Sequence, residues 1–481
     1  MKPSKTSRRD FLKVTAKLTA KLTAGGGLLA AWPGAGAVRA APADPAPNIV
    51  IVLADDHTGR DCGCYGNKDV RTPNIDRLAT QGMVFNNAFT SAAMCTPTRA
   101  QLYTGVFPVR NGAYPNHSKC QTGARSIVHH LKALGYRVGI TGKNDQRPGD
   151  VFPFEQTHNI GNFINRSARE PYCLIFASNH PHWDWPEPDG YDPARLTVPP
   201  YMVDNPETRL ALASYYTEVT QLDAEVGQCL AEVEKSGAAD HTIFIYTSEQ
   251  GSTFPFAKWT CYDLGLKTAM IVRWPKRVRA GSSSAALVQY VDVVPTLVEA
   301  AGGNPGRCDT GLPGAPDGGR GFDGRSFLKV LLGQSDQHDE YVYGVHTTAG
   351  IIRGSPYPVR SIRSATHKYI WNLTPEATFK NAVTDLNHGG CWNAWVRDAA
   401  ANPFAAERVK MYQHRPAEEF YDVVNDPYEL HNLADKPECR APMDAMRRKL
   451  EAWMEQQGDK GVATELGVKA ARQGGGQDAG E

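Results

Sequence analysis

Cys95 begins a short pattern in which a proline follows at position 97 and an arginine at position 99. This spacing is the pattern read by enzymes that oxidise cysteine to formylglycine, an aldehyde whose hydrate is a nucleophile. The same residues also fit a buried thiol with a proline in the first turn of a helix, where the missing N–H costs nothing. A five-residue pattern recurs by chance, so its surroundings must decide between the two interpretations.

Two adjacent carboxylates lie upstream of this pattern. The apolar run Asn48–Ala54 predicts a strand that is buried on both faces, as in a parallel sheet. Asp55 and Asp56 follow it directly, at the edge where open α/β sheets bind ligands. Because adjacent carboxylates repel each other, a hard divalent cation is the predicted partner. A solvated turn is the alternative, since Asp and Gly are ordinary turn residues.

Further motifs follow in one order from about residue 48 to residue 434, and together they resemble the formylglycine-dependent sulfatases of the alkaline phosphatase superfamily. Two more runs, residues 151–154 and 251–256, resemble the N-sulfoglucosamine sulfohydrolase (sulfamidase) branch of that family. Several spaced motifs in one order are more specific than any single motif. The motifs are residues 53–56, 72–79, 82–89, 95–99, 105, 134–136, 142–143, 419–422 and 426–434.

The resemblance implies hydrolysis of a sulfate ester or a sulfamate, with a sulfated saccharide as the substrate class. In that family one hydroxyl of the hydrated formylglycine attacks sulfur, and the other loses its proton to expel sulfate. A divalent metal acts as a Lewis acid; Ca²⁺ is the implied ion and Mg²⁺ the alternative. The implied cofactors are therefore this cation and Cys95 in its formylglycine form.

Matching the family's motifs residue by residue implies a role for each candidate. Arg99 lies in a predicted first helical turn, where the helix dipole disfavours a cation, so a functional role is favoured. The imidazole of His182 could donate a proton to the leaving group near neutral pH. The implied metal ligands are Asp55, Asp56, Cys95, Glu249 and Gln250; the implied catalytic residues are Cys95, Arg99, Lys143, Asp145 and His182; the implied substrate-binding residues are Lys143, His182, Lys258 and His117.

The sequence departs from the family's pattern at two places. The family has aspartate followed by asparagine or histidine where this chain has Glu249 and Gln250, each longer by one methylene group. The oxygen ligands are kept, and Ca²⁺ tolerates flexible geometry. The family reads Gly-Lys-x-His where this chain reads Gly142, Lys143, Asn144 and Asp145. A carboxylate there is repelled by an anionic sulfate unless nearby cations screen it.

Two alternatives to a sulfatase stay open on the sequence alone. The first is a phosphonate monoester or phosphodiester hydrolase, which shares the fold and the metal site. The second is a catalytically silent pseudo-sulfatase that binds carbohydrate, motivated by Asp145, Glu249 and Gln250. Relative hydrolysis rates on a sulfate ester and a phosphodiester distinguish the first, and the mass of the Cys95 peptide distinguishes the second.

The first forty residues predict an export signal of the bacterial twin-arginine type. Arg8 and Arg9 precede Phe11, and a cleavage site is predicted at residues 38–40. Lysines interrupt the apolar stretch, which is therefore too short to span a bilayer. The predicted location is the periplasm or outside the cell. The implied partners are the twin-arginine translocase and a formylglycine-generating enzyme acting before folding buries Cys95, with no stable membrane insertion.

The charge of the chain excludes one class of partner. Residues 1–40 hold eight Lys and Arg and one Asp, so their removal changes the formal charge from +1 to −6. A mildly acidic protein has no global field that attracts nucleic acid. Ten cysteines include no C-x-x-C pair, so most are predicted to be packing residues, and any disulfide pairing stays open.

Apolar runs alternate with helical patterns along most of the chain. Strands are predicted at 137–141, 172–178, 242–248 and 268–274, and helices at 125–135, 206–235 and 292–302. This order predicts an α/β fold with a large, mostly parallel central sheet sandwiched by helices. The predicted organisation is a signal at 1–40, a catalytic domain at 44–340, a smaller C-terminal α+β subdomain with an antiparallel sheet at 341–470, and a disordered tail at 471–481.

Overall fold

The computed structural model describes residues 46–144, 146–167 and 170–467. The predicted signal at 1–40, the tail at 471–481 and the candidate Asp145 lie outside the described residues. The predictions made for them therefore stay predictions, as do the domain boundaries. Within the described part of the chain, no helix has both the length and the apolar character needed to cross a membrane.

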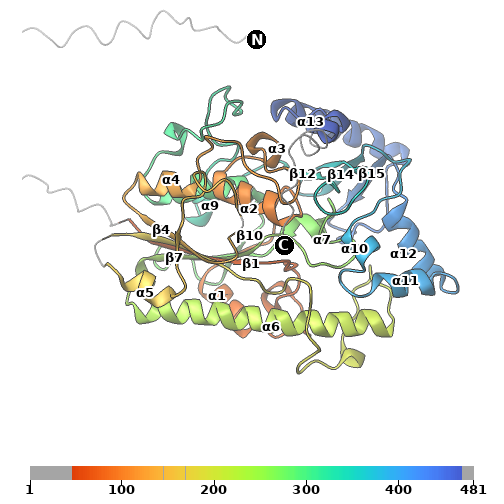
Figure 1. Ribbon diagram of the computed structural model, residues 1–481, viewed down its shortest axis with the longest axis horizontal. Helices are drawn as coiled ribbons and strands as arrows, with labels where there is room; N and C mark the ends of the chain where they lie inside the picture. The colour runs from red at the N-terminus through yellow and green to blue at the C-terminus, as the bar shows by residue number, and fades with distance from the viewer. Residues whose placement is uncertain (1–45, 145, 168–169, 468–481) are drawn as a thin grey trace, which may run out of the picture. The chain divides into compact units, whose positions relative to one another are not determined.

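A central sheet of eight strands has the order β10-β2-β9-β7-β1-β6-β4-β5 (Figure 1). β1 pairs in parallel with β7 on one side and with β6 on the other, and β6 continues in parallel to β4; β9 runs antiparallel to both of its neighbours. The predicted mostly parallel sheet is thus confirmed. Its strands are β1 (Asn48–Ala54), β2 (Met83–Phe85), β4 (Arg137–Gly142), β5 (Glu155–Gln156), β6 (Tyr172–Ala177), β7 (Thr242–Ser248), β9 (Met270–Arg273) and β10 (Ser282–Ser284).

Strand β1 lies in the middle of this sheet because both of its faces are apolar. Ile49, Ile51 and Leu53 belong to the apolar cluster on one face of the sheet, and Val50 and Val52 belong to the cluster on the other. All five side chains are at most 1% exposed. Successive residues of a strand point to opposite faces, so an unbroken apolar run requires helices on both sides.

Helices cover the two faces of the central sheet. The long helix α6 runs along one face together with α1, and α2, α4 and α8 pack on the other (Figure 1). Helix α6 begins at Pro206, a residue favoured in the first turn of a helix. The side chain of the preceding Asn205 caps it by accepting a hydrogen bond from the N–H of Thr208. The helices are α1 (Pro73–Gln81), α2 (Cys95–Thr104), α3 (Pro108–Asn111), α4 (Ile127–Lys132), α5 (Ile160–Asn165), α6 (Pro206–Lys235), α7 (Asp263–Leu266), α8 (Val293–Ala300), α9 (Leu328–Leu331), α10 (Ala382–Leu386), α11 (Trp392–Asp398), α12 (Pro403–Gln413) and α13 (Arg440–Gln456).

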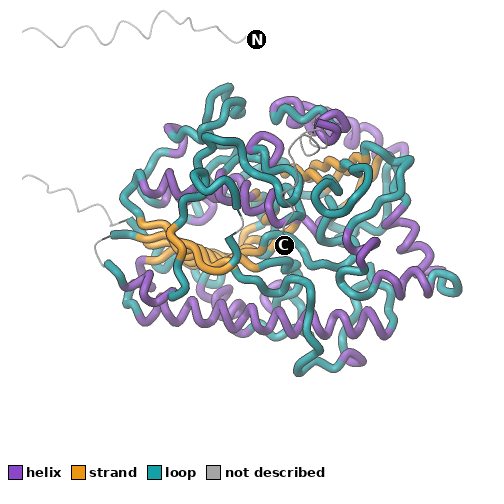
Figure 2. The backbone as a smooth tube through the Cα atoms, in the orientation of Figure 1, coloured by secondary structure: helices purple, strands orange, loops and turns teal. Residues whose placement is uncertain are grey.

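Two smaller sheets complete the fold. The C-terminal sheet is antiparallel throughout, packs against α13, and forms a group of strands separate from the central sheet in Figure 2. The predicted C-terminal antiparallel sheet is therefore confirmed. Its strands are β12 (Val342–His346), β13 (Val359–Arg363), β14 (His367–Asn372) and β15 (Glu418–Asp422); a three-stranded sheet has the order β11 (Val288–Gln289), β3 (Ala88–Phe89) and β8 (Lys267–Thr268).

Two predicted elements differ from the structure. The single strand expected at 268–274 is two strands, because the chain leaves the three-stranded sheet after β8 and enters the central sheet at β9. The helix expected at 125–135 ends at Lys132, since Gly135 adopts a left-handed φ of 86° that turns the chain toward β4. All ten cysteines lie in the described residues as free thiols, and seven of them are buried, which agrees with a packing role for most.

Candidate active site

Three parallel strands end side by side at one edge of the central sheet. The N–H of Asp55 donates to the carbonyl of His180 at 3.0 Å, and the N–H of Glu249 donates to the carbonyl of Ala54 at 3.0 Å. Asp56 adopts a left-handed φ of 64°, which turns the chain sharply after β1. The loops that follow β1, β6 and β7 therefore begin next to one another.

Cys95 is the first residue of α2, and every residue of this helix is buried. Its Sγ lies 3.8 Å from Oδ1 of Asp55 and 3.6 Å from Nε2 of Gln250. Burial, assisted by the carboxylate of Glu249, raises the pKa of the Cys95 thiol well above its usual range. The encoded thiol is therefore protonated at neutral pH and is a weak nucleophile.

Arg99 follows Cys95 by one helical turn, and its guanidinium is fully buried. Nε donates to the carboxylate of Glu249, Nη1 donates to the carbonyl of Lys143 at 3.0 Å, and Nη2 lies 3.9 Å from Oδ2 of Asp55. Arg99 therefore connects the start of α2 to the ends of three strands of the central sheet.

Two lysines are directed at the two aspartates. Nζ of Lys143 lies 2.6 Å from Oδ2 of Asp55, and Nζ of Lys258 lies 2.6 Å from Oδ2 of Asp56. The Lys143 side chain is 20% exposed, whereas Lys258 is 2% exposed. Both predicted substrate cations therefore lie at the cluster, and Lys143 is the one that solvent reaches.

The formal charges of the buried cluster cancel. Burial by itself would raise the pKa of Asp55, but Lys143 and Arg99 outweigh burial and hold it well below its usual range. For Glu249 burial dominates over the same cations and raises its pKa to about 7. Carboxylates this deep need positive partners to stay ionised. The cluster holds three carboxylates, Asp55, Asp56 and Glu249, and three cations, Arg99, Lys143 and Lys258.

The donor atoms at this edge fit a hard divalent cation. One ligand atom from each of Asp55, Asp56, Cys95 and Glu249 lies within 4.8 Å of all the others. Gln250 donates from Nε2 to Oδ1 of Asp56 at 2.7 Å, and its buried Oε1 has no hydrogen-bond partner among the described residues. Carboxylate and amide oxygens are the ligands that Ca²⁺ and Mg²⁺ prefer. The longer Glu249 and Gln250 side chains thus still reach the two aspartates.

The two candidate histidines lie at different depths. Nε2 of His182 lies 3.7 Å from Oδ2 of Asp56, and its side chain is 40% exposed. His117 adopts a left-handed φ of 57°, its N–H donates to Oγ1 of Thr96 at 3.1 Å, and its ring contacts Nδ2 of Asn116 at 3.1 Å. His182 therefore borders the carboxylate cluster directly, while His117 lies beside the start of α2. Asp145 lies outside the described residues.

Two residues that make polar contacts around the site, Thr253 and His180, were not among the predicted site residues. Thr253 donates from Oγ1 to Oδ2 of Asp56 at 3.0 Å, from within the run 251–256 that carries the sulfamidase resemblance. Nδ1 of His180 contacts the carboxylate of Glu218, and this hydrogen bond raises the pKa of His180 despite its burial. The motif at 251–256 could have indicated Thr253, whereas no sequence signal connects His180 to a residue on α6.

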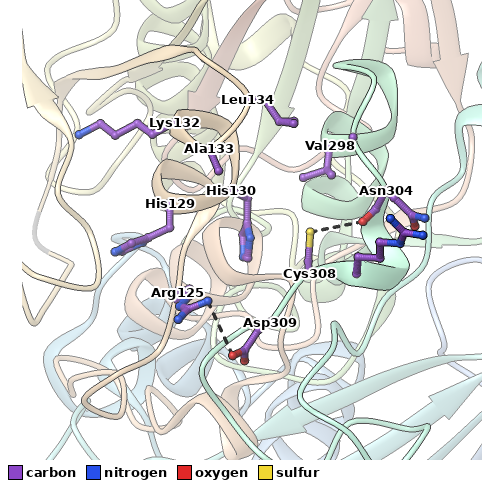
Figure 3. A pocket seen from close by; sticks show the side chains of 12 residues that line it. Arg125, His129, His130, Lys132, Ala133, Leu134, Val298, Asn304, Cys308 and Asp309 are labelled. Atoms are coloured by element: carbon purple, nitrogen blue, oxygen red, sulfur yellow. Dashed lines mark hydrogen bonds and ion pairs between the residues drawn. The ribbon is translucent and has the colours of Figure 1, made fainter.

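A pocket of about 760 Å³ lies elsewhere in the fold, away from the carboxylate cluster (Figure 3). It lies between α4 and the segment that follows α8, and Arg125 points across it toward Asp309 at 3.7 Å. Sγ of Cys308 lies 3.7 Å from the carbonyl oxygen of Asn304. None of the residues lining this pocket is a predicted site residue, so it is separate from the candidate active site.

Gly142 immediately precedes Lys143 and allows the backbone to pass close to β6. Its φ is 81°, and a Cβ at this position would lie 2.0 Å from the carbonyl oxygen of Ala177. Gly142→Ala is expected to lower the free energy of unfolding by about 2 kcal/mol or more and to reduce turnover, because Lys143 is displaced. Denaturant unfolding and kinetics measure the two effects.

The matched control for this substitution is Gly149→Ala. Apart from its two chain neighbours, no heavy atom of the described residues would lie within 4 Å of a Cβ at position 149, so the replacement should change the free energy of unfolding by less than about 0.5 kcal/mol. Equal stability of the two variants would contradict the close approach of Gly142 to β6.

Comparison with known proteins assigns the family. A family model described as Sulfatase matches residues 47–168 and 155–303. An ulvan-active sulfatase of Formosa agariphila is 32% identical over 432 residues, which cover 86% of this chain and 81% of the relative. The chain belongs to the sulfatase family. This confirms the resemblance stated from the sequence, and the reaction class of this sulfatase is the hydrolysis of sulfate esters.

Other relatives of this sulfatase bear on its branch and its fold. Human N-sulphoglucosamine sulphohydrolase is 27% identical, over 88% of this chain and 92% of its own length. A solved structure of a protein in complex with its substrate D-glucosamine-2-N,6-O-disulfate has a TM-score of 0.64 at 19% identity, covering 86% of this chain and 98% of its own. A phosphonate monoester hydrolase of Agrobacterium radiobacter has the same TM-score at 17% identity, covering 85% and 96%. At these identities the two structures establish the fold alone.

Proposed function

We propose that this sulfatase removes a sulfo group, held as a sulfate ester or a sulfamate, from a sulfated saccharide. The observation that carries the proposal is the buried cluster in which Cys95 begins α2 beside three carboxylates and three cations. Three similar proteins support a saccharide as the substrate. One relative is named for ulvan, another is named for N-sulphoglucosamine, and a protein of similar fold has a glucosamine disulfate as its substrate.

Cys95 acts, in this proposal, after its oxidation to formylglycine by a maturation enzyme. The encoded thiol is buried and protonated, so it lacks the thiolate character that a cysteine nucleophile requires. The hydrated aldehyde supplies a hydroxyl nucleophile and a second hydroxyl whose deprotonation releases sulfate. Because α2 is buried throughout, the oxidation must precede folding, and it therefore takes place before export.

Asp55, Asp56, Glu249 and Gln250 would hold a divalent cation, for which Ca²⁺ is the proposed ion and Mg²⁺ the alternative. When bound, the cation supplies Lewis acidity that stabilises negative charge near residue 95. The four residues come from the loops after β1 and β7, and Cys95 comes from the start of α2, so their convergence depends on the register of β1 with β7. The buried Oε1 of Gln250, which has no hydrogen-bond partner within the described part of the chain, is consistent with a ligand role.

The cations of the cluster hold the sulfo group in this proposal. Lys143 and Lys258 supply ammonium groups for its oxygens, and Arg99 positions residue 95 through Glu249 and the Lys143 carbonyl. His182 is the partly exposed imidazole next to Asp56 and donates the proton that the leaving oxygen or nitrogen needs. His117 lines the substrate side near Thr96. Asp145 replaces the family's histidine as a candidate base.

Removing the metal tests the cation directly. Dialysis against a chelator is expected to abolish sulfate release and to lower the midpoint of thermal unfolding, because the metal binds the folded state only. Adding Ca²⁺ back should restore both, and a parallel titration with Mg²⁺ compares the two ions. A chelated enzyme that keeps full turnover would contradict a metal-dependent site.

Substrate preference tests the function itself. Hydrolysis rates are compared for the sulfate ester and the methyl phosphodiester of 4-nitrophenol, followed by sulfate release from a panel of O- and N-sulfated saccharides. The proposal expects the sulfate ester to be preferred and at least one saccharide to be desulfated. A clear preference for the phosphodiester would favour the phosphonate monoester hydrolase alternative, which the fold similarity motivates.

The predicted location is part of the proposal. Export by the twin-arginine route would bring a folded, already oxidised enzyme to the periplasm or the medium, where sulfated polysaccharides occur. The −6 formal charge that remains without residues 1–40 leaves binding of a sulfated anion to the local cations of the site.

A further inference from the structure

Each of the two residues His182 and Lys258 is followed in the chain by a tryptophan, and both indoles contact one imidazole. The ring of His388 lies 6.2 Å from the ring of Trp183, centroid to centroid, at an interplanar angle of 35°. It lies 5.9 Å from the ring of Trp259 at an angle of 50°. His388 comes from the C-terminal part of the chain, so three separate segments meet beside the carboxylate cluster.

The backbone of the segment 387–390 packs closely against the loop that follows β7 and contains Thr253. Asn387 adopts a left-handed φ of 54° that ends α10, and its Oδ1 accepts from the N–H of Asn393 at 2.9 Å. Gly389 has a φ of 81°, and a Cβ there would lie 2.1 Å from the carbonyl oxygen of Thr253. Thr253 itself donates to Asp56. The position of His388 is therefore tied to the loop that contacts the proposed metal ligand.

The cluster of Trp183, Trp259 and His388 adjoins the cations of the site. Nζ of Lys258 lies 4.8 Å from the centroid of the Trp259 ring. Burial, then Lys258 and His182, lower the pKa of His388, so its imidazole is neutral and offers one N–H donor and one acceptor. Trp183 and His388 are half-buried, and the buried Nε1 of Trp259 has no hydrogen-bond partner among the described residues.

We propose that Trp183 and His388, supported from behind by the buried Trp259, form the sugar-binding wall of the site, with His388 as a specificity residue that hydrogen-bonds a hydroxyl of the ring carrying the sulfo group. Indole faces pack against the apolar C–H face of a pyranose, and a neutral imidazole both donates to and accepts from hydroxyl groups. The sulfo group is held by Lys143 and Lys258, so the ring attached to it must lie close by. This inference rests on the proposed function and deepens it by assigning the residue that selects a saccharide over another sulfate ester.

The test compares two substrates with one enzyme series. Wild type, His388→Ala and His388→Gln are assayed on D-glucosamine-2-N,6-O-disulfate and on 4-nitrophenyl sulfate, which has no sugar ring, and the saccharide's affinity is measured by quenching of tryptophan fluorescence. His431→Ala is the matched control, because His431 is exposed on a different loop. Thermal unfolding confirms that each variant is folded.

The expected result for His388→Ala is a fall of about tenfold or more in kcat/KM for the saccharide, mainly through KM, with less than about a twofold change for 4-nitrophenyl sulfate. His388→Gln should recover part of the loss, since its amide can donate and accept. Equal losses on both substrates, or no loss on either, would overturn the assignment while leaving the proposed function intact. A wild-type enzyme that cleaves 4-nitrophenyl sulfate but neither binds nor cleaves any saccharide of the panel would overturn the proposed function and this inference together.

Discussion

Replacing Cys95 by alanine is expected to lower kcat/KM on any sulfate ester by about ten-thousandfold or more, because no nucleophile is left at the start of α2. The contacts of Sγ are long, 3.8 Å to Asp55 and 3.6 Å to Gln250, so the rest of the cluster should keep its arrangement. The free energy of unfolding should therefore change by only about 1 kcal/mol. Steady-state kinetics and denaturant unfolding measure the two effects.

Cys229→Ala is the matched control for this substitution. Cys229 is another buried free cysteine, on α6, which covers the face of the sheet opposite to α2. Its removal should cost about the same free energy of unfolding and leave turnover within about twofold of wild type. A comparable loss of turnover in both variants would indicate a general effect on folding rather than a lost nucleophile.

Peptide mass spectrometry of the same protein separates the proposed mechanism from a silent binding protein. In protein from a host that has the modifying enzyme, the peptide containing residue 95 should be lighter than the unmodified cysteine peptide. The reason is that the CH2SH side chain of cysteine is replaced by an aldehyde, CHO. An intact thiol in that protein would contradict the formylglycine proposal and favour the carbohydrate-binding alternative.

Asp56→Asn is expected to remove metal binding and to lower kcat/KM by at least about a hundredfold. Oδ2 of Asp56 accepts from Lys258 at 2.6 Å and from Thr253 at 3.0 Å, and Oδ1 accepts from Gln250 at 2.7 Å. The amide would leave the ammonium of Lys258, which is 2% exposed, without its counter-charge. Measured with a chelator present, the free energy of unfolding should fall by about 3 kcal/mol.

The double variant Asp56→Asn with Lys258→Met is the control that separates the two losses. Methionine is close to lysine in volume and carries no charge, so the unpaired buried ammonium is removed. Stability should recover in a double-mutant cycle, while metal content and turnover should stay low. Metal analysis and unfolding of all four proteins test this. Full metal content in Asp56→Asn would contradict its role as a ligand.

Much of the fold follows from local sequence patterns. Residues 49–54 are all apolar, so both faces of this segment are apolar. The segment Asn48–Ala54 forms a strand in the middle of the central sheet. The helix predicted at 206–235 has those bounds in the structure, because Asn205 and Pro206 begin it unambiguously. The run 268–274 was mispredicted, since a strand propensity cannot indicate that the chain changes sheets at Ala269.

The candidate site was predictable only in part, for a related reason. Asp55 and Asp56 belong to one short sequence motif and Cys95 to another, and the structure places all three beside Glu249. The contact between His180 and Glu218 joins a strand end to a helix, and no local pattern encodes it. His388 lies about 130 residues beyond Lys258 in the chain, where no motif indicated a role, and it reaches the site only through the packing of 387–390 on Thr253.

The residue types that chemistry at this site needs are evident in the sequence: a cysteine in an oxidation motif, paired carboxylates at the end of a buried strand, and a lysine directly after another predicted strand. These follow from local spacing, because strand ends in a parallel sheet share one edge. Two further features are visible only in the folded chain: three carboxylates and three cations balance each other in one buried cluster, and two tryptophans meet one histidine beside it. Charge balance and ring packing depend on distances between segments far apart in the chain, which spacing along the chain does not encode.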